Sequence, residues 1–456
     1  MATTQPAQTL PPGPRGLPGV GHLFQFQRDP LAFVRGVQRA YPRLATVQIA
    51  GRTVIMFFRP EHARFFLVDQ ARSFAVGSGR DMMRRFLGDA LLTTDGDVHR
   101  QQRRLVQPAF HKKRVESYAE IMVRQTEDLL DTWRPDERLD IAAAMQELTL
   151  RIVVEALFNL DLRTQSAGLS HLFTQVVEAQ NPVLLRYSTL DLPFLPYHKV
   201  VLARNQLDAF IYDFIAARRA AERDEGDVLS MLLQTRDEEN GQMLDDVGIR
   251  DQMMTLIAAG HETTSNSLAW TFYLLSRHPE IRDRLLGELA SVLGGRPPTV
   301  DDLARLPYLD WVVNESMRVY PPAWTLGRGA IEPFELEGYR FPAGTRVMFS
   351  QWVIHHLTDV WGDPDIFRPE RWDPATGQKP PPGAYFPFGA GPRMCIGMPF
   401  AQIEARLVLA AILQRFTPEL IPGYQVEALP RVTLRVKHGL PMTLRPTTAP
   451  VPAVTR

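Results

Sequence analysis

The chain has 456 residues, of which 51 are basic and 51 acidic, and 45% are hydrophobic. This length exceeds the roughly 250–300 residues at which one hydrophobic core stops growing, so we expect two packed sub-regions or one large layered fold. The composition excludes a disordered, collagen-like or membrane-spanning chain, and the balanced charge gives no argument for nucleic acid as a partner. A single cysteine excludes an internal disulfide. Because no apolar stretch is long enough for a signal peptide or a membrane anchor, we expect a soluble, cytoplasmic protein.

The hydrophobic pattern favours a mainly α-helical fold with small β-sheets. Residues 44–58 alternate apolar and polar positions around Gly51 and Arg52, which predicts a hairpin. Most segments between residues 61 and 223 have helical periodicity. A long helix over about 245–277 is apolar on most faces, so we expect it to be buried. The other expected elements are helices at about 280–293, at about 309–319 and from Cys395 to about 416, and short strands within 331–349 and 430–445.

The only cysteine, Cys395, lies in a glycine-rich segment directly before a predicted helix. Gly389, Gly391 and Gly397 permit tight turns and a close approach of the backbone to a ligand. The unpaired N–H groups and the dipole at a helix N-terminus stabilise a thiolate. A lone cysteine is more often a small buried hydrophobe, and without a second cysteine it cannot form a Cys-rich zinc site. The surroundings favour a nucleophile or a single axial metal ligand, and the residues alone leave both open.

A polar cluster interrupts the long apolar helix. Gly260 costs about 1 kcal/mol of helix stability relative to alanine, and His261, Glu262, Thr263 and Thr264 follow it. Polar groups in an apolar helix are unfavourable unless they are paired. The ordinary alternative is a buried polar turn in which a hydroxyl bonds back to a carbonyl one turn earlier.

Together, these two segments resemble the cytochrome P450 superfamily. The glycine-rich segment matches the haem-binding pattern F-x-x-G-x-R-x-C-x-G, and the polar cluster is similar to the A/G-G-x-D/E-T segment over the haem. The resemblance covers roughly residues 10–445 and implies a cytochrome P450 fold, with the haem between the long buried helix and the helix after the cysteine. We expect a Pro/Gly-rich lead-in over residues 1–23 and a single catalytic domain over 24–456. The matching residues are Phe388, Gly391, Arg393, Cys395 and Gly397, and Ala259, Gly260, Glu262 and Thr263.

The resemblance implies that Cys395 is the axial ligand of a haem b iron. A thiolate ligand donates electron density to the iron, which favours cleavage of the O–O bond. Haem propionates are anions that bind arginine or histidine. A family helix with Trp-x-x-x-Arg is similar to the segment around Arg103, with His99 in place of the tryptophan. Arg328 is equally compatible with an ordinary loop arginine. The implied propionate partners are His99, Arg103, Arg328 and Arg393, and the further cofactor-binding residues are Phe388, Gly389, Gly397, Ala259 and Gly260.

For the polar cluster, the resemblance implies a catalytic pair of an acid and an alcohol. Small residues at Ala259 and Gly260 let O2 sit against the helix. The hydroxyl of Thr263 then holds the distal oxygen and a water, while Glu262 links the site to bulk protons. Delivery of a proton to the distal oxygen is general acid catalysis.

Glu315 and Arg318 lie three residues apart on a predicted helix, a spacing that alone usually gives a weak, solvated pair. With Arg371 they resemble the family's buried charge triad. A buried carboxylate with two guanidiniums needs good geometry, because losing one partner leaves an unpaired charge. We assign the three residues to folding and haem incorporation.

The leading hypothesis is a haem-thiolate monooxygenase that inserts one oxygen atom of O2 into a C–H bond of a hydrophobic small molecule. The substrate class stays open among fatty acids, terpenoids, steroids and macrolides. One alternative is a haem-thiolate peroxygenase or rearranging enzyme, which usually lacks the acid–alcohol pair, and a more remote one is a non-enzymatic helical binding protein. Residues 181–198 are expected at the pocket mouth. The pocket candidates, each equally compatible with plain core, are Leu92, Ala258, Ala323, Trp324 and Leu326.

Electrons are expected from separate proteins, because the chain has no flavin- or iron–sulfur-binding segment. A ferredoxin or a flavodoxin with its NAD(P)H reductase is the expected donor, and an acidic carrier docks on a basic patch. The candidate patch has a competing interpretation as a solvated helix face. It consists of Arg100, Arg104, Lys112 and Lys113.

Overall fold

The computed structural model describes residues 10–76, 81–161, 172, 192, 196–221, 223–236, 241–377 and 379–447. The chain groups into two compact units, and each unit is assembled from three separate stretches of sequence. Cys395 belongs to unit 1, whereas the helix with Glu262 and Thr263 belongs to unit 2. The expected lead-in over 1–23 and single domain over 24–456 stay predictions. Unit 1 comprises Met1–Arg80, Ala323–Ile366 and Lys379–Cys395, and unit 2 comprises Asp81–Pro322, Phe367–Gln378 and Ile396–Arg456.

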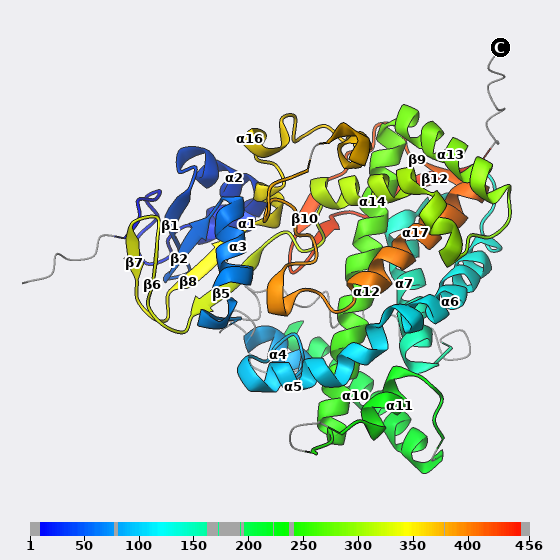
Figure 1. Ribbon diagram of the computed structural model, residues 1–456, viewed down its shortest axis with the longest axis horizontal. Helices are drawn as coiled ribbons and strands as arrows, with labels where there is room; N and C mark the ends of the chain where they lie inside the picture. Colours follow the sequence, from blue (N-terminus) through cyan, green and yellow to red (C-terminus); the bar gives the residue numbers. More distant parts are fainter. Residues whose placement is uncertain are drawn as a thin grey trace, which may run out of the picture. The chain divides into compact units, whose positions relative to one another are not determined.

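Unit 1 is built on a five-stranded sheet with the strand order β1-β2-β8-β5-β3 (Figure 1). β1 and β2 form the predicted hairpin, and its turn residues Ala50 and Gly51 have φ angles of 52° and 72°. This left-handed pair is what a type I′ turn requires. β8 pairs in parallel with β2 and antiparallel with β5. The bounds are β1 Leu44–Ile49, β2 Arg52–Phe57, β3 Phe74–Ala75, β5 Leu326–Ala330 and β8 Arg346–Phe349.

Phenylalanine rings fill the core of unit 1. The ring of Phe66 lies 4.8 Å from that of Phe57 and 4.9 Å from that of Phe74, in edge-on arrangements. Such pairs contribute about 0.5–1.5 kcal/mol beyond the burial of their surface. The β6–β7 hairpin adds Phe334 and Phe341, whose rings stack 4.7 Å apart. The remaining elements of unit 1 are α1 Leu23–Arg28, α2 Pro30–Ala40, α3 Pro60–Arg64, β6 Phe334–Leu336, β7 Tyr339–Phe341, α15 Gln351–Ile354 and α16 Thr358–Trp361.

Unit 2 contains the long helices, together with a three-stranded sheet in the order β4-β12-β9 and the β10–β11 hairpin. The strand character expected over residues 430–445 is present there in β11 and β12. Its helices are α4 Asp81–Leu87, α5 Gly96–Val106, α6 Lys112–Leu130, α7 Ile141–Phe158, α10 Pro196–Ala221, α11 Val228–Gln234, α12 Asp246–Arg277, α13 Pro279–Leu293, α14 Pro307–Val319 and α17 Met398–Arg415. Its strands are β4 Arg138–Asp140, β9 Phe416–Leu420, β10 Ala428–Pro430, β11 Leu434–Val436 and β12 Pro441–Pro446.

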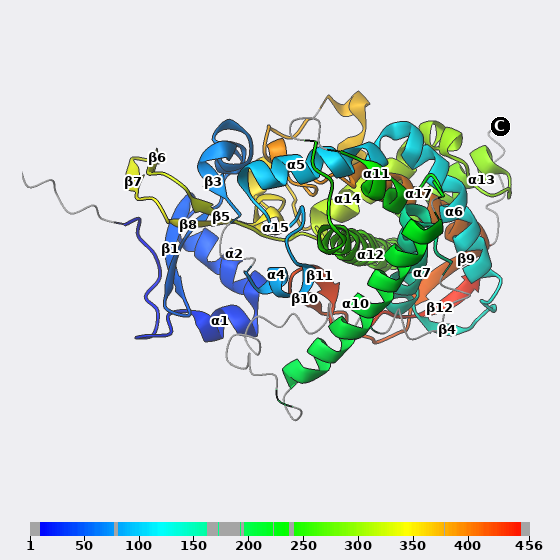
Figure 2. The ribbon, with the colours of Figure 1, turned by 90° about the horizontal axis from the view of Figure 1, so that it is seen from below.

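α12 is the predicted long helix. The side chain of Asp245 caps its N-terminus by accepting a hydrogen bond of 2.7 Å from the N–H of Gly248, and the helix ends just before Pro279. Figure 2 looks along α12, with α10 crossing it. As expected, the helix is buried over most of its length. Among the helices of the described residues, none combines the length and the apolar composition that crossing a bilayer requires.

The close packing of α12 on α7 explains the glycine in its middle. A methyl group at Gly260 would come within 2.7 Å of Cγ2 of Val153 on α7. One residue later, the carbonyl of His261 accepts a hydrogen bond of 2.9 Å from the hydroxyl of Thr149, also on α7. Gly260 therefore lowers intrinsic helix stability but permits this contact.

α17 carries a carboxyl group inside the core of unit 2. Glu404 is 0% exposed, and within the described part of the chain neither of its oxygens has a hydrogen bond of good geometry. Burial raises the pKa of Glu404 well above its ordinary value of 4.5, and the nearby hydroxyl of Thr264 on α12 offsets only part of this effect. Burial therefore favours the protonated form of this carboxyl group in the folded protein.

This protonation makes stability depend on pH in a defined direction. Above pH 4.5 the unfolded chain releases the proton of Glu404 but the folded protein keeps it, so the free energy of unfolding falls as pH rises. We expect Glu404→Gln, which stays neutral, to gain stability over the wild type between pH 5 and 8, by at most about 1.4 kcal/mol per pH unit. Denaturant unfolding at several pH values measures the difference. The exposed Glu120→Gln on α6 is the control, and a difference that does not change with pH would contradict the prediction.

Candidate functional site

The loop with Cys395 is folded back on itself. The N–H of Cys395 donates to the carbonyl of Phe388 at 2.9 Å, and the N–H of Met394 donates to the carbonyl of Gly391 at 3.0 Å. Gly389 has a φ of 71°, in the left-handed region that favours glycine. The side chain of Cys395 is exposed and forms no disulfide. The loop thus presents a single sulfur atom from a backbone that is held by its own hydrogen bonds.

Two glycines of this loop differ in what surrounds them. Gly391 has a φ of 68°, and a methyl group there would come within 1.8 Å of the carbonyl oxygen of Leu67. Leu67 belongs to a π-helical turn of unit 1, Phe65–Asp69. A methyl group at Gly389 would meet no atom within 4 Å among the described residues. Gly391 is thus required by both backbone conformation and space, and Gly389 by conformation alone.

α12 leaves one small-residue face uncovered. Between Ile249 and Phe272, all of which the structure describes, every residue is buried except those at 258–260 and 263. Ala259 is the most exposed of these, although it lies in the middle of the helix. The hydroxyl of Thr263 donates to the carbonyl of Ala259 at 2.8 Å, which is the back-bonding alternative considered from the sequence. This bond uses the donor of Thr263 and leaves its oxygen as an acceptor on the uncovered face.

Glu262 lies on a different side of α12 and is 6% exposed. Its carboxylate accepts hydrogen bonds from the hydroxyl of Thr433 and, at 2.7 Å, from Nε of Arg435. Sequence reasoning missed both partners. The available signal was that residues 433 and 435 alternate with Leu434 along a predicted strand, which places one hydroxyl and one cation on the same face.

The propionate candidates are divided between the units. His99 and Arg103 lie one turn apart on α5 in unit 2, where His99 is buried and Arg103 is half-buried. Arg328, on β5, is buried, and its Nη1 donates to the carbonyl of Gly327 at 2.8 Å. Arg393 is half-buried in the cysteine loop. Unit 1 therefore holds two arginines together with the thiol.

The three residues of the expected charge triad meet in unit 2. Nε and Nη2 of Arg318 donate to the two oxygens of Glu315 at 2.9 and 2.8 Å, and Nε of Arg371 donates to one of them at 3.2 Å. The N–H of Arg368 and the indole of Trp372 add hydrogen bonds to the same carboxylate at 3.0 Å each. The side chains of Glu315 and Arg318 are 0% exposed. Burial lowers the pKa of the Arg371 guanidinium below its ordinary value, and the Glu315 carboxylate opposes this effect.

The pocket candidates have unequal environments. Leu92, Ala258, Ala323 and Leu326 are half-buried. Trp324 is 3% exposed, and its ring lies 6.3 Å from that of Phe26 in unit 1. Most of the expected mouth segment, residues 181–198, lies outside the described residues.

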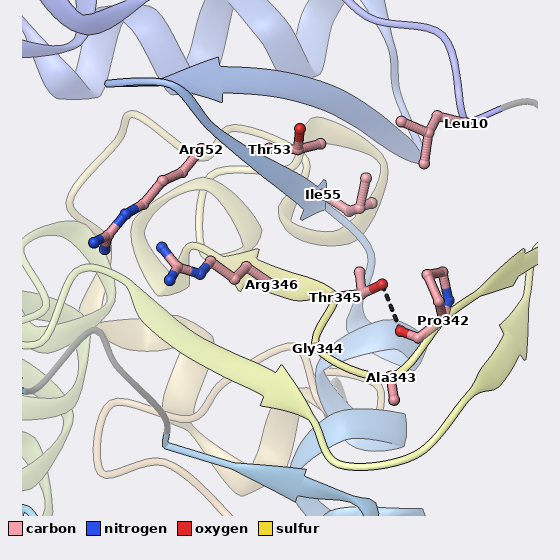
Figure 3. Close-up of a pocket in the computed structure, with 9 residues that line it drawn as sticks. All are labelled: Leu10, Arg52, Thr53, Ile55, Pro342, Ala343, Gly344, Thr345 and Arg346. Carbon is pink, nitrogen blue, oxygen red and sulfur yellow. Dashed lines mark hydrogen bonds between the residues drawn. The ribbon is translucent and has the colours of Figure 1, made fainter.

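A surface groove of about 390 Å³ lies in unit 1, away from the predicted site residues in sequence (Figure 3). Arg52 from β2 and Arg346 from β8 extend on the same side of this groove. The hydroxyl of Thr345 is turned to its own loop and donates to the carbonyl of Pro342 at 2.7 Å. None of the predicted catalytic or cofactor-binding residues lines the groove.

Comparison with known proteins decides the family. The family model described as Cytochrome P450 matches residues 11–440. The chain belongs to the cytochrome P450 family. This P450 is 37% identical to cyclooctatin synthase of Streptomyces melanosporofaciens, over 95% of each chain. It is 33% identical to cyclooctat-9-en-7-ol 5-monooxygenase of the same organism, over 90% of each chain, and 33% identical to pentalenene oxygenase of Streptomyces avermitilis, over 95% of this chain and 96% of that one.

Solved structures agree with this P450 in fold. A cyanobacterial P450 with bound retinoic acid matches with a TM-score of 0.88 and 29% identity, over 97% of this chain and 100% of that one. The haem domain of a second P450 matches with a TM-score of 0.89 and 28% identity, over 97% and 99%. The expected fold class and the expected enzyme class, a P450 monooxygenase, are thereby confirmed.

The residues present fit the haem–thiolate cofactor that the family implies. Cys395 offers an exposed sulfur from a loop whose backbone is fixed. The uncovered face of α12 consists of two alanines, a glycine and a threonine, which is small enough for a flat group and a diatomic ligand to approach. Histidine and arginine side chains are present in both units as partners for carboxylates.

The two loop glycines allow a matched test of backbone constraint. Both Gly389→Ala and Gly391→Ala place a methyl group on a left-handed residue, which costs roughly 1–2 kcal/mol. We expect Gly391→Ala to lower the free energy of unfolding by about 1–3 kcal/mol more, because its methyl group meets the carbonyl of Leu67. Chemical denaturation measures the free energy of unfolding of both variants. Equal decreases would contradict the prediction, because they would show that the loop moves away from Leu67 without loss of stability.

The charge triad gives a prediction on stability. Glu315→Ala leaves two buried guanidiniums without their shared carboxylate, so we expect the free energy of unfolding to fall by about 3–5 kcal/mol. The control is Glu116→Ala in α6, which removes an exposed ion pair with Lys112 at 3.7 Å and should leave stability nearly unchanged. Denaturant titration measures both, and a similar small loss in the two variants would refute a structural role of the triad.

Proposed function

We propose that this P450 monooxygenase acts on a terpenoid and inserts one oxygen atom into a C–H bond of its hydrocarbon skeleton. The observation that carries the proposal is the nearly full-length similarity to relatives named for terpenoid compounds, cyclooctatin synthase and pentalenene oxygenase. A solved neighbour contains retinoic acid, an isoprenoid. These names favour terpenoids over the fatty acids, steroids and macrolides that the sequence alone left open.

Haem b is the proposed cofactor, with Cys395 holding its iron through the thiolate. The chemistry that bound haem supplies is the activation of O2, so that one oxygen atom enters the substrate and the other leaves as water, with electrons and protons consumed. Four side chains are proposed to pair with the propionates: His99, Arg103, Arg328 and Arg393. The proposed role of Glu315, Arg318 and Arg371 is to stabilise the fold that receives the cofactor.

Thr263 and Glu262 are the proposed proton-handling residues. Because the Thr263 hydroxyl already donates to the carbonyl of Ala259, its oxygen is oriented to accept a hydrogen bond on the uncovered face of α12. Glu262 is a carboxylate that accepts a hydrogen bond from the guanidinium of Arg435. Adjacent helix residues do not face each other, and the two groups therefore act on different sides of α12.

Electrons are proposed to come from a ferredoxin or a flavodoxin with its NAD(P)H reductase. The proposed docking patch in unit 2 consists of exposed residues, Arg100, Arg104, Lys112 and Lys113. Arg100 pairs with Asp97 and Lys112 with Glu116, so part of its charge is neutralised locally. An acidic carrier would still meet a net excess of basic side chains there.

The spectrum of the reduced protein with carbon monoxide, followed by turnover of terpenoid hydrocarbons, tests the proposal. We expect a thiolate-type spectrum for the wild type and its loss in Cys395→Ser, because an alcohol oxygen does not replace the sulfur as a donor. We expect pentalenene-like hydrocarbons to give substrate-type spectral shifts and hydroxylated products with a ferredoxin system.

Matched panels of fatty acids and steroids serve as controls. Product from a fatty acid but from no terpenoid would contradict the substrate class and leave the enzyme class intact. Turnover with peroxide alone, at the rate of the reductase-driven reaction, would favour the peroxygenase alternative. A colourless protein after haem-replete expression would overturn the cofactor assignment.

A further inference from the structure

One face of α12, called the polar stripe, is hydrogen-bonded to Thr433 and Leu434 at the start of β11. Glu262, Asn266 and Trp270 follow one another at intervals of four residues, which places them on one face of the helix. The amide of Asn266 donates to the hydroxyl of Thr433 at 3.1 Å, and Nε1 of Trp270 donates to the carbonyl of Leu434 at 2.9 Å. The hydroxyl of Thr433 in turn donates to Glu262. This stripe is distinct from the uncovered face of α12.

The carboxylate of Glu262 is held through one oxygen. Thr433 donates to Oε1, and Nε and Nη2 of Arg435 both lie 2.7 Å from the same atom. Among the described residues, Oε2 accepts no hydrogen bond. Because Asn266 already donates to the Thr433 oxygen, the hydrogen of that hydroxyl is directed to Glu262. The two oxygens of this carboxyl group therefore have different surroundings: Oε1 is held by hydrogen bonds, and Oε2 is not, within the described part of the chain.

The residues that bind Oε1 flank Leu434, whose backbone is held by neighbouring segments. Leu434 is fully buried, and its N–H donates to the carbonyl of Pro322 at 2.9 Å. The β10–β11 pairing fixes the same residue against Pro430. Arg435 is therefore carried by a strand that has partners on more than one side.

The ion pair is partly removed from water. The side chains of Arg435 and Glu262 are 14% and 7% exposed, so their attraction is screened less than that of a surface pair. Another titratable group beside this ion pair is His261 of α12, and burial lowers its pKa below the ordinary 6.5. His261 is therefore neutral near pH 7, and Arg435 is the cation that contacts the carboxyl group of Glu262.

We propose that Arg435 and Thr433 are positioning residues for the proton-carrying carboxyl group. They anchor Oε1 of Glu262 and thereby leave Oε2 as the atom that takes up and releases the proton. Thr433 and the strand β11 that follows it thus set the orientation of the acid on α12. This inference rests on the proposed function, because the proton carried by Glu262 has its use in that reaction.

The test compares Arg435→Gln, Arg435→Lys and Thr433→Val with the wild type in a reductase-driven assay. We expect a several-fold higher ratio of hydrogen peroxide to product in Arg435→Gln. Arg435→Lys restores the charge and should return this ratio toward the wild-type value, whereas Thr433→Val should raise it as Arg435→Gln does. Substrate-induced spectral shifts should keep the wild-type dissociation constant.

Denaturant unfolding supplies a readout that does not depend on turnover. If Arg435 acts on Glu262, the double variant Glu262→Gln/Arg435→Gln loses clearly less stability than the sum of the losses in Glu262→Gln and Arg435→Gln. The matched control is Lys437→Gln, which removes a nearby exposed cation that pairs with Glu427. Additive losses, or a wild-type ratio of hydrogen peroxide to product in Arg435→Gln, would overturn the inference, and so would equal uncoupling by Lys437→Gln. If the wild type gives no product, the proposed function is refuted. The unfolding comparison then still tests whether Arg435 holds Glu262.

Discussion

A buried helix presents a reactive face only if neighbours hold its other faces. α12 meets this condition through two kinds of contact. On one side it approaches α7 so closely that a methyl group at position 260 would come within 2.7 Å of Cγ2 of Val153. On another, a stripe of polar and aromatic side chains is hydrogen-bonded to Thr433 and to Leu434, the first residue of β11. These contacts fix the rotation of the helix, and so they determine that Ala259 and Thr263 are the residues left uncovered.

The proposed chemistry uses groups from both compact units. The sulfur of Cys395 stands at the end of the last stretch of unit 1, and α17 begins three residues later in unit 2. The loop is therefore constrained at both ends, by the contact of Gly391 with Leu67 and by Gly397 as the residue before the first turn of α17. The acid, the alcohol and the charge triad lie wholly in unit 2. Positioning of the sulfur thus depends on a short piece of backbone with little freedom.

Much of the fold could be predicted because its signals are local. The bounds of α12 follow from a capping aspartate and a terminal proline, and the β1–β2 hairpin follows from an alternating pattern around Gly51. The partners of Glu262 could not be found in this way, because Thr433 lies 171 positions further along the chain. No periodic pattern reports a pairing over that distance. The same limit applies to Gly260, whose role in helix packing depends on the position of Val153.

The connectivity of the five-stranded sheet has a consequence for biosynthesis. β1 and β2 leave the ribosome early, but β8, which pairs in parallel with β2, follows only after most of unit 2 has been made. Until then the edge of β2 has unpaired backbone groups, and such edges invite association with other chains. Contacts that are this distant in sequence also form slowly. The nascent chain must therefore keep an incomplete sheet out of aggregation while its helical unit is being translated, which is a task for chaperones that bind extended strands.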